Sequence, residues 1–151
     1  MTTRTTHATV TVRRSLDAPV PRVFRAWSDR AAVARWYLPG NDWVSRVDEH
    51  DFRVGGRVRM TFGPRSEPPY FECSHFEDIV PQARIVYAMT VGRGELRLTT
   101  SMVTVCFTGT SAGTDLVVTD QMVILDDRET SADREAGWGE TLDKLAPELA
   151  R

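Results

Sequence analysis

The hydrophobic residues of the last twenty positions recur with the spacing of a helix. Trp138, Leu142, Leu145 and Leu149 are separated by four, three and four residues. A helix places residues at these spacings on one stripe, so the pattern predicts a long C-terminal helix that packs one side against the rest of the protein. Core packing is the plain interpretation of this stripe, and a second is that Trp138 and Leu142 also line a cavity.

Four further residues bear on this helix. Thr130, followed three residues later by Asp133, is a capping arrangement at its start. Gly137 costs about 1 kcal/mol of helix stability relative to alanine, which favours a close approach of helix and sheet at this position. Pro147 should kink or shorten the last turn.

Most of the chain before this helix alternates between hydrophobic and polar positions. In the stretch 9–14, Val10 and Val12 share one face, which predicts a half-buried strand. Alternating runs later in the chain predict six more strands, at about 43–48, 57–62, 71–80, 84–91, 98–108 and 115–124. The connections between them are short and mostly rich in glycine or proline, so we expect hairpins and an antiparallel meander.

Two short helices are predicted between the first strand and the others. Hydrophobic residues at helical spacing indicate the first, at about 20–28, with Asp17 or a neighbour as its cap and Pro19 near its first turn. The second covers about 31–37 and ends at Pro39-Gly40.

The order of these elements predicts an α+β fold, in which a curved antiparallel sheet wraps around the long C-terminal helix. Such a sheet, gripping one helix, can enclose a cavity. We expect a flexible N-terminal tail over residues 1–8 and a single domain over residues 9–150.

Composition is that of an ordinary globular protein. The chain has 151 residues, of which 41% are hydrophobic and 26% charged, and a net charge of −2. This charge gives no reason to expect binding to nucleic acid or to an anionic membrane. No hydrophobic run is long enough for a signal peptide or a membrane span, so we expect a cytoplasmic protein without membrane insertion. Cys73 and Cys106 are expected to be buried thiols.

Several kinds of chemistry are not indicated. The sequence has no Gly-x-Ser-x-Gly nucleophile motif, no P-loop and no dinucleotide-binding fingerprint. His7, His50 and His75 are scattered, without the spacing of metal ligands. We therefore expect no metal site and no cofactor, and we assign no catalytic residue.

Asp120 is the most informative polar residue. In the run Leu116, Val118, Asp120, Met122 it occupies a position whose neighbours at the same parity are hydrophobic. A buried carboxylate is costly unless it is paired or hydrated. Either the strand shifts at a bulge and exposes Asp120, or Asp120 faces a cavity and orients a ligand.

Two other strands carry candidate residues. On 71–80, the more hydrophobic parity includes His75 and Glu77, so both could face inward, and His75 could act as an acid–base group or as a hydrogen-bonded structural residue. On 84–91, Tyr87 and Met89 share the hydrophobic parity, and Tyr87 could offer a hydroxyl to a cavity.

Aromatic residues gather around the Pro39-Gly40 turn. Trp36, Tyr37 and Trp43 form either a hydrophobic cap over the sheet edge or a gate to the cavity. The predicted ligand-binding residues share a place on the expected inner surface: Trp36, Tyr37, His75, Tyr87, Met89, Asp120, Trp138 and Leu142.

In order and spacing, several segments resemble the activator-of-Hsp90-ATPase-like branch of the START/Bet v 1-like superfamily. They are Ala18 to Trp27, Arg35 to Pro39, Phe52 to Arg57, Ile79 to Tyr87, Gly113 to Val118 and Gly137-Trp138 with Leu142 and Leu145. The resemblance covers about residues 10–150 and implies a helix-grip fold. Within the eukaryotic protein that stimulates the Hsp90 ATPase, the chain resembles only the C-terminal domain. Relatives in the wider superfamily bind lipids, hormones or polyketides, and some are cyclases or hydrolases.

The sequence is compatible with three functions. The leading hypothesis is a protein that binds a small apolar or amphipathic molecule without changing it, with a regulatory or stress-related role left open. The second is a cavity enzyme of cyclase or hydrolase type that uses Asp120 and His75. The third is a co-chaperone-like interaction module that acts on a chaperone ATPase. A homodimer also remains open.

Overall fold

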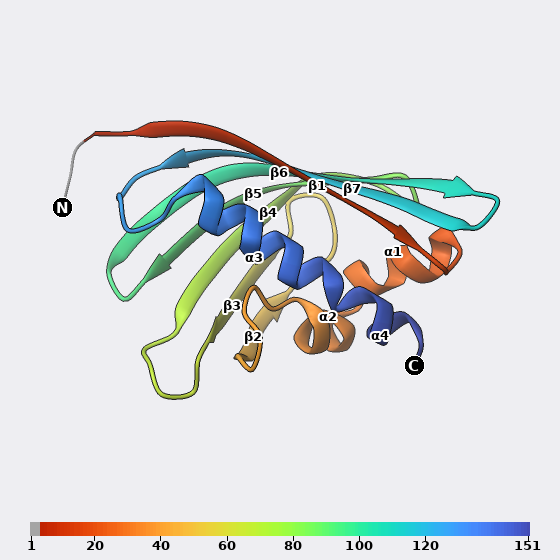
Figure 1. Ribbon diagram of the computed structural model, residues 1–151, viewed down its shortest axis with the longest axis horizontal. Coiled ribbons are helices and arrows are strands. Elements are labelled where there is room, and N and C mark those ends of the chain that lie inside the picture. Colours follow the sequence, from red (N-terminus) through yellow and green to blue (C-terminus); the bar gives the residue numbers. More distant parts are fainter. Residues whose placement is uncertain (1–3) are drawn as a thin grey trace.

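The structure, a computed structural model, describes residues 4–151 and contains one curved antiparallel sheet with all described helices on its concave face (Figure 1). The sheet order is β1-β7-β6-β5-β4-β3-β2. Its strands are β1 (Thr6–Leu16), β2 (Val44–His50), β3 (Arg57–Gly63), β4 (Tyr70–Val80), β5 (Arg84–Arg93), β6 (Leu96–Thr110) and β7 (Gly113–Ile124). The helices are α1 (Val20–Ser28), α2 (Arg30–Trp36), α3 (Ser131–Asp143) and α4 (Leu145–Leu149). The predicted helix-grip α+β fold is confirmed.

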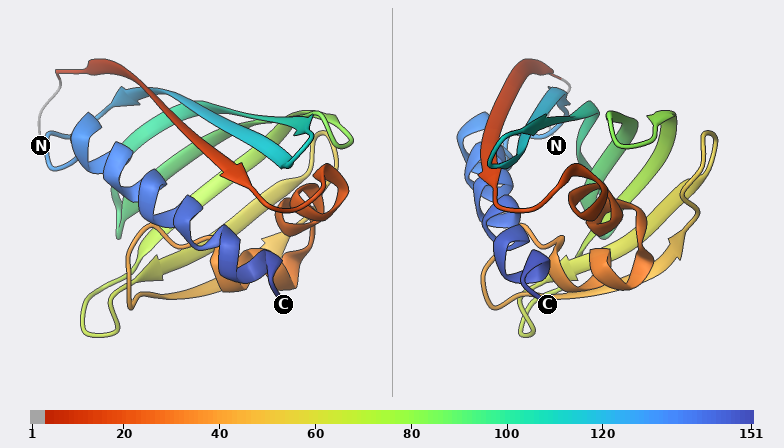
Figure 2. Two further views of the ribbon diagram at one scale, coloured as in Figure 1. Left: turned by 45° about the vertical axis from the view of Figure 1, so that its right-hand side comes forward. Right: turned by 90° about the vertical axis from the view of Figure 1, so that its right-hand side faces the viewer.

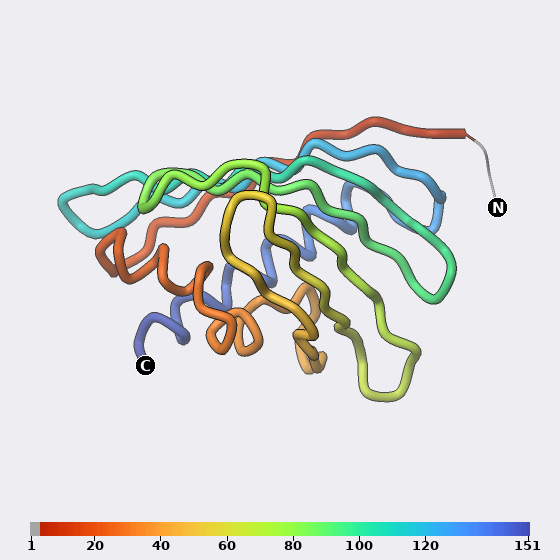
Figure 3. Tube along the Cα trace, turned by 180° about the vertical axis from the view of Figure 1, so that it is seen from behind, coloured from red at the N-terminus to blue at the C-terminus, as the bar shows by residue number. Residues whose placement is uncertain are grey.

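Hairpins connect successive strands from β2 to β7, as the alternating sequence pattern indicated (Figure 3). The exception to this local pairing is β1, which pairs with β7 over its whole length. Of the predicted tail over residues 1–8, residues 1–3 lie outside the described part of the chain. The rest of that prediction extends too far, because β1 already begins at Thr6, which pairs with Ile124.

The helix α3 crosses the concave face of the sheet, and α1 and α2 lie beneath its C-terminal end (Figure 2). Its start is as predicted: the Thr130 side chain accepts a hydrogen bond from the Asp133 backbone at 3.1 Å. The predicted stripe is buried: Trp138 and Leu142 of α3 and Leu145 of α4 are all nearly inaccessible to solvent.

The start of α1 differs from the prediction, whereas the end of α3 agrees with it. Asp17 does not cap α1, whose N-cap is Pro19 with no side-chain hydrogen bond. Pro147 has no N–H to donate to the carbonyl of Asp143, and α3 ends at that residue. A separate last turn, α4, follows, in agreement with the predicted shortening.

A buried carboxylate fixes α4 against α2. Arg35 donates two hydrogen bonds to the carboxylate of Glu148, at 2.9 and 2.7 Å. The Arg22 guanidinium of α1 also donates to the backbone carbonyl of Glu148 at 2.8 Å. The three shorter helices therefore close one end of the gripped space as a single unit.

The glycine in α3 provides a test of helix packing. A Cβ at Gly137 would lie 3.5 Å from Cβ of Pro39, which is an ordinary contact. We expected this glycine to face the sheet, but it faces the Pro39 turn instead. We predict that Gly137→Ala raises the free energy of unfolding by about 1 kcal/mol, because alanine is the better helix former. Chemical denaturation measures this change.

The same substitution at Gly113 serves as the contrast. Gly113 has φ +146°, and a Cβ there would lie 2.1 Å from the Leu16 carbonyl oxygen. Gly113→Ala should therefore destabilise the protein. If both variants lost stability to the same extent, the described packing of α3 against Pro39 would be wrong.

Candidate functional site

A cavity of about 340 Å³ lies between α3 and the inner face of β3, β4 and β5. The turn between α2 and β2 forms another side of it, through Pro39 and Trp43. Aromatic side chains make up much of the wall: Tyr37, Trp43, Phe62, Tyr70 and Trp138. Charged side chains from β4, α3 and the loop before α3 complete the lining.

The half-buried Trp43 packs the turn between α2 and β2 against the sheet. Its ring is nearly parallel to that of Tyr70, with 5.6 Å between centroids and 16° between planes. It also stacks against Phe62 at 6.3 Å. A Cβ at Gly40 would lie 2.2 Å from the Trp43 ring, so only glycine leaves room for the ring to lie on this turn.

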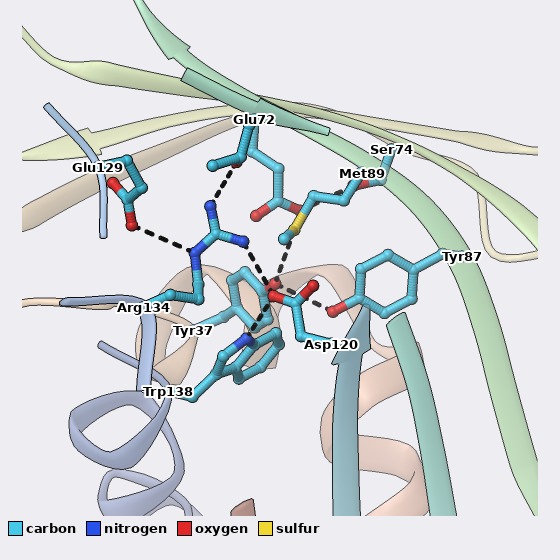
Figure 4. A network of polar contacts seen from close by, with 10 residues as sticks. Tyr37, Glu72, Ser74, Tyr87, Met89, Asp120, Glu129, Arg134 and Trp138 are labelled. Atoms are coloured by element: carbon cyan, nitrogen blue, oxygen red, sulfur yellow. Dashed lines mark hydrogen bonds and ion pairs between the residues drawn. The ribbon is translucent and has the colours of Figure 1, made fainter. Parts of the chain in front are cut away.

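Asp120 faces inward, so the first of its two readings, a bulge that exposes it, is wrong. The residue is fully buried on β7. Its Oδ2 accepts hydrogen bonds from Nη1 of Arg134 and Nε1 of Trp138, both at 2.9 Å (Figure 4). Among the described residues, no hydrogen-bond partner reaches its Oδ1. Asp120 itself lies behind the cavity wall, where it joins α3 to the sheet.

Arg134 is the partner that the sequence analysis missed. It is 9% exposed, donates to the Thr99 hydroxyl through Nη2, and its Nε lies 3.5 Å from Oε1 of Glu129. A signal was present, because Arg134 precedes Trp138 by one helical turn and so extends the buried stripe of α3 toward its start. Its charge made it look like a residue of the solvent face.

Glu72 is the second residue that the sequence analysis missed. It lines the cavity and is only 4% exposed, and no other carboxyl of the lining is buried among the described residues. The Ser74 hydroxyl donates to its Oε2 at 2.9 Å. Burial raises the pKa of Glu72 to about 7, although the hydroxyls of Ser74 and Tyr37 and the charge of Arg134 pull this pKa down. Glu72 is therefore close to half-ionised at neutral pH.

His75 was expected to face inward, and that orientation is wrong. The inward residues of β4 are Glu72, Ser74 and Phe76, whereas His75 and Glu77 are exposed. The pairing of β4 with β5 shifts between Phe76 and Asp78, which marks a bulge. The parity of His75 looked the more hydrophobic because it also contains Phe71 and Cys73, which lie on the outer face. It contains Ile79 as well, which packs on the core only because the bulge reverses the alternation.

A second, smaller cavity of about 30 Å³ lies next to the first, and Glu72 lines both. Its volume exceeds the roughly 10–15 Å³ that a cavity needs in order to hold one water molecule. Polar groups around it include Tyr37, Tyr87, Ser74 and the half-buried His50. The hydroxyls of Tyr37 and Tyr87 lie 3.1 Å apart, and burial raises the pKa of both, so both stay neutral.

The predicted site residues thus divide into two groups. Tyr37, Met89 and Trp138 line the main cavity and Tyr87 lines the small one. Trp36 and Leu142 line neither: Trp36 donates to the backbone carbonyl of Ala26 at 2.8 Å, and both are core residues. Hydrophobic size placed them correctly in the interior but could not tell the core from a cavity wall.

The remaining chemistry of the described residues is simple. Cys73 and Cys106 are free thiols and, contrary to expectation, only partly buried, because both lie on the outer parity of their strands. No group of three or more His, Cys, Asp or Glu side chains is arranged to hold a metal within residues 4–151. Over the same range, no helix combines the length and hydrophobicity needed to cross a membrane.

Comparison with known proteins identifies relatives over nearly the whole chain. The family model described as "Activator of Hsp90 ATPase homolog 1-like protein" matches residues 17–150. A solved structure of a protein from Rhizobium leguminosarum is 36% identical, with a TM-score of 0.88, and the match covers 98% of this chain and 97% of that one. A protein from Rhizobium loti is 33% identical, with a TM-score of 0.86 and coverages of 96% and 99%. No curated protein matches the chain.

The buried ion pair leads to a stability prediction. We expect Asp120→Asn to lower the free energy of unfolding by about 3 kcal/mol, because Arg134 loses its closest counter-charge inside the protein. Asp115→Asn is the matched control: Asp115 is an exposed residue of β7, and its replacement should change stability by less than about 0.5 kcal/mol. Equal losses in the two variants, measured by urea denaturation, would contradict the role of Asp120 in joining α3 to the sheet.

The pKa of Glu72 leads to a prediction about pH. This pKa is about 7 in the folded protein and near the ordinary value of 4.5 in the unfolded chain. Between these values the folded state binds more protons, so its stability should fall as pH rises from 5 to 8, by up to about 3 kcal/mol from this one group.

The measurement is urea denaturation of the wild type and Glu72→Gln at several pH values. The variant has no carboxyl at this position, so its stability should depend less on pH over the window from 5 to 8. Parallel pH curves for the two proteins would show that Glu72 keeps an ordinary pKa.

Proposed function

The chain belongs to the activator of Hsp90 ATPase homolog 1-like family, and on this premise we propose that it binds one small amphipathic molecule in the cavity between α3 and the sheet. Proteins of this fold family commonly bind ligands. The observation that carries the proposal is the 340 Å³ cavity, whose wall combines five aromatic side chains with the buried carboxyl of Glu72. Aromatic and hydrophobic side chains with placed polar groups are the usual components of a small-molecule site.

The size of the cavity favours a compact ligand. Sites for small molecules range from about 300 to 1,000 Å³, and this cavity lies near the lower limit. A molecule of two or three rings is compact enough for a site of this size, whereas a long acyl chain would extend beyond it. Binding of a compact molecule without chemical change is therefore our proposal for the function.

The two residues required by the enzyme hypothesis do not lie together in the structure. It required Asp120 and His75 to face one point, but Asp120 is paired with Arg134 beneath α3, and His75 is exposed on the outer face. The co-chaperone hypothesis rests on the family description alone, since no contact or surface described above favours it. Ligand binding is the function that a specific feature of the chain supports.

The proposal is tested by filling the cavity. Val91 lines it from β5, whereas Val86 lies on the opposite face of the same strand. We expect a neutral hydrophobic dye, N-phenyl-1-naphthylamine, to bind the wild type and Val86→Phe with increased fluorescence, and to bind Val91→Phe at least about tenfold more weakly. Native mass spectrometry of the freshly purified protein should show a bound small molecule.

Equal dye binding by the two variants would place the site outside this cavity. A wild-type protein that carries no small molecule after purification and binds no dye would contradict the proposed function itself. Circular dichroism of both variants distinguishes a filled cavity from a misfolded protein.

A further inference from the structure

We propose that the ligand is a small organic cation, an aromatic or alkyl amine, whose ammonium group is bound by Glu72 while its hydrocarbon part packs on the aromatic wall. This inference rests on the proposed function, because it names the class of ligand for the same cavity. Three observations support it: the balance of charge in the lining, the pairing of the two arginines, and the environment of Glu72.

The balance of charge in the lining is acidic. Two guanidinium groups line the cavity, those of Arg128 and Arg134. The carboxyl groups of the lining outnumber them and are Glu72, Glu129, Asp133 and Glu140. Four carboxyl groups against two guanidinium groups make the lining attractive to cations when all of them are ionised.

Both arginines of the lining already have carboxylate partners. Nη1 of Arg134 lies 2.9 Å from Asp120, and its Nε lies 3.5 Å from Glu129. Nε of Arg128 lies 3.7 Å from Oδ1 of Asp126. An anionic ligand would have to compete with these carboxylates, so the arginines do not by themselves make an anion site.

Glu72 differs from these partners, because no ion pair to it exists among residues 4–151. Its close contacts are neutral hydroxyls, those of Ser74 at 2.9 Å and of Tyr37, and Arg134 affects it only through a longer-range charge interaction. A ligand ammonium in the cavity would supply both a counter-charge and hydrogen-bond donors to this carboxyl. Such charge-assisted bonds are stronger in a buried site than in water.

The aromatic wall suits the same ligand. The faces of Trp and Tyr rings attract cations within about 6 Å of their centres. One ring of this wall already makes such a contact, since the Arg93 guanidinium lies 4.1 Å from the centroid of Tyr70. Aromatic rings of this kind can pack against hydrocarbon and attract positive charge to their faces.

The test compares three probes of similar size and different charge by isothermal titration calorimetry at pH 8: 2-phenylethylamine, 2-phenylethanol and 3-phenylpropanoate. We expect the wild type to bind the amine at least about tenfold more tightly than the alcohol, and the carboxylate most weakly. Glu72→Gln should lose this preference but keep its affinity for the alcohol, which also reports that its cavity is intact.

Glu77→Gln is the matched control, because Glu77 is an exposed carboxylate on the same strand. It should keep the preference of the wild type for the amine. A general weakening of cation binding through net charge would affect both variants equally and would overturn the inference.

The outcomes separate this inference from the proposed function. If the alcohol or the carboxylate binds as tightly as the amine, or if the amine fails to bind a protein that binds the neutral dye, the cation inference is wrong and ligand binding stands. If Glu72→Gln keeps the preference for the amine, Glu72 is not its binding group. If neither the dye nor any probe binds the wild type, both proposals fail.

Discussion

The buried ion pair between Asp120 and Arg134 determines how the helix sits on the sheet. It joins β7 to the first turns of α3, and the indole N–H of Trp138 donates to the same carboxylate oxygen. Toward the C-terminal end of α3, the half-buried Arg14 of β1 donates to Asp143 and to the carbonyl of Gly139. These polar contacts hold α3 at a fixed distance from the sheet, and the cavity lies in the space that they leave open.

This arrangement explains why the interior contains charge at all. Hydrophobic residues alone would allow α3 to settle onto the sheet until the gap closed, because burial of hydrophobic surface has no preferred direction. An ion pair with hydrogen bonds has a preferred geometry, and breaking it inside the protein is costly. The polar residues beside it, such as Glu72 and Ser74, then face a space that side chains do not fill completely.

The sequence predicted the fold well and the site only in part. Alternation and helical spacing located every strand and helix, since those patterns depend on one buried face per element. Asp120 stood out because it interrupts a hydrophobic parity. His75 was assigned to the wrong face because Phe71 and Cys73 make the outer parity of β4 look hydrophobic, and because the bulge beside Glu77, which brings Ile79 onto the core side, leaves no mark in the sequence. Glu72 was missed because its parity on β4 looked the less hydrophobic of the two. Arg134 was missed because its charge suggested the solvent face of α3, although it continues the buried stripe.

The pairing of β1 with β7 has a consequence for how the protein folds. The first strand finds its partner about a hundred residues later, and α3 follows that partner. Contacts that span most of the chain form slowly, because the ends must meet before the bonds between them form. During synthesis from the N-terminus, β1 must therefore remain unpaired until β7 has left the ribosome, and the hairpins from β2 to β6 can form first. The cavity closes only after that pairing becomes possible, since α3, the helix that covers it, follows β7 in the chain.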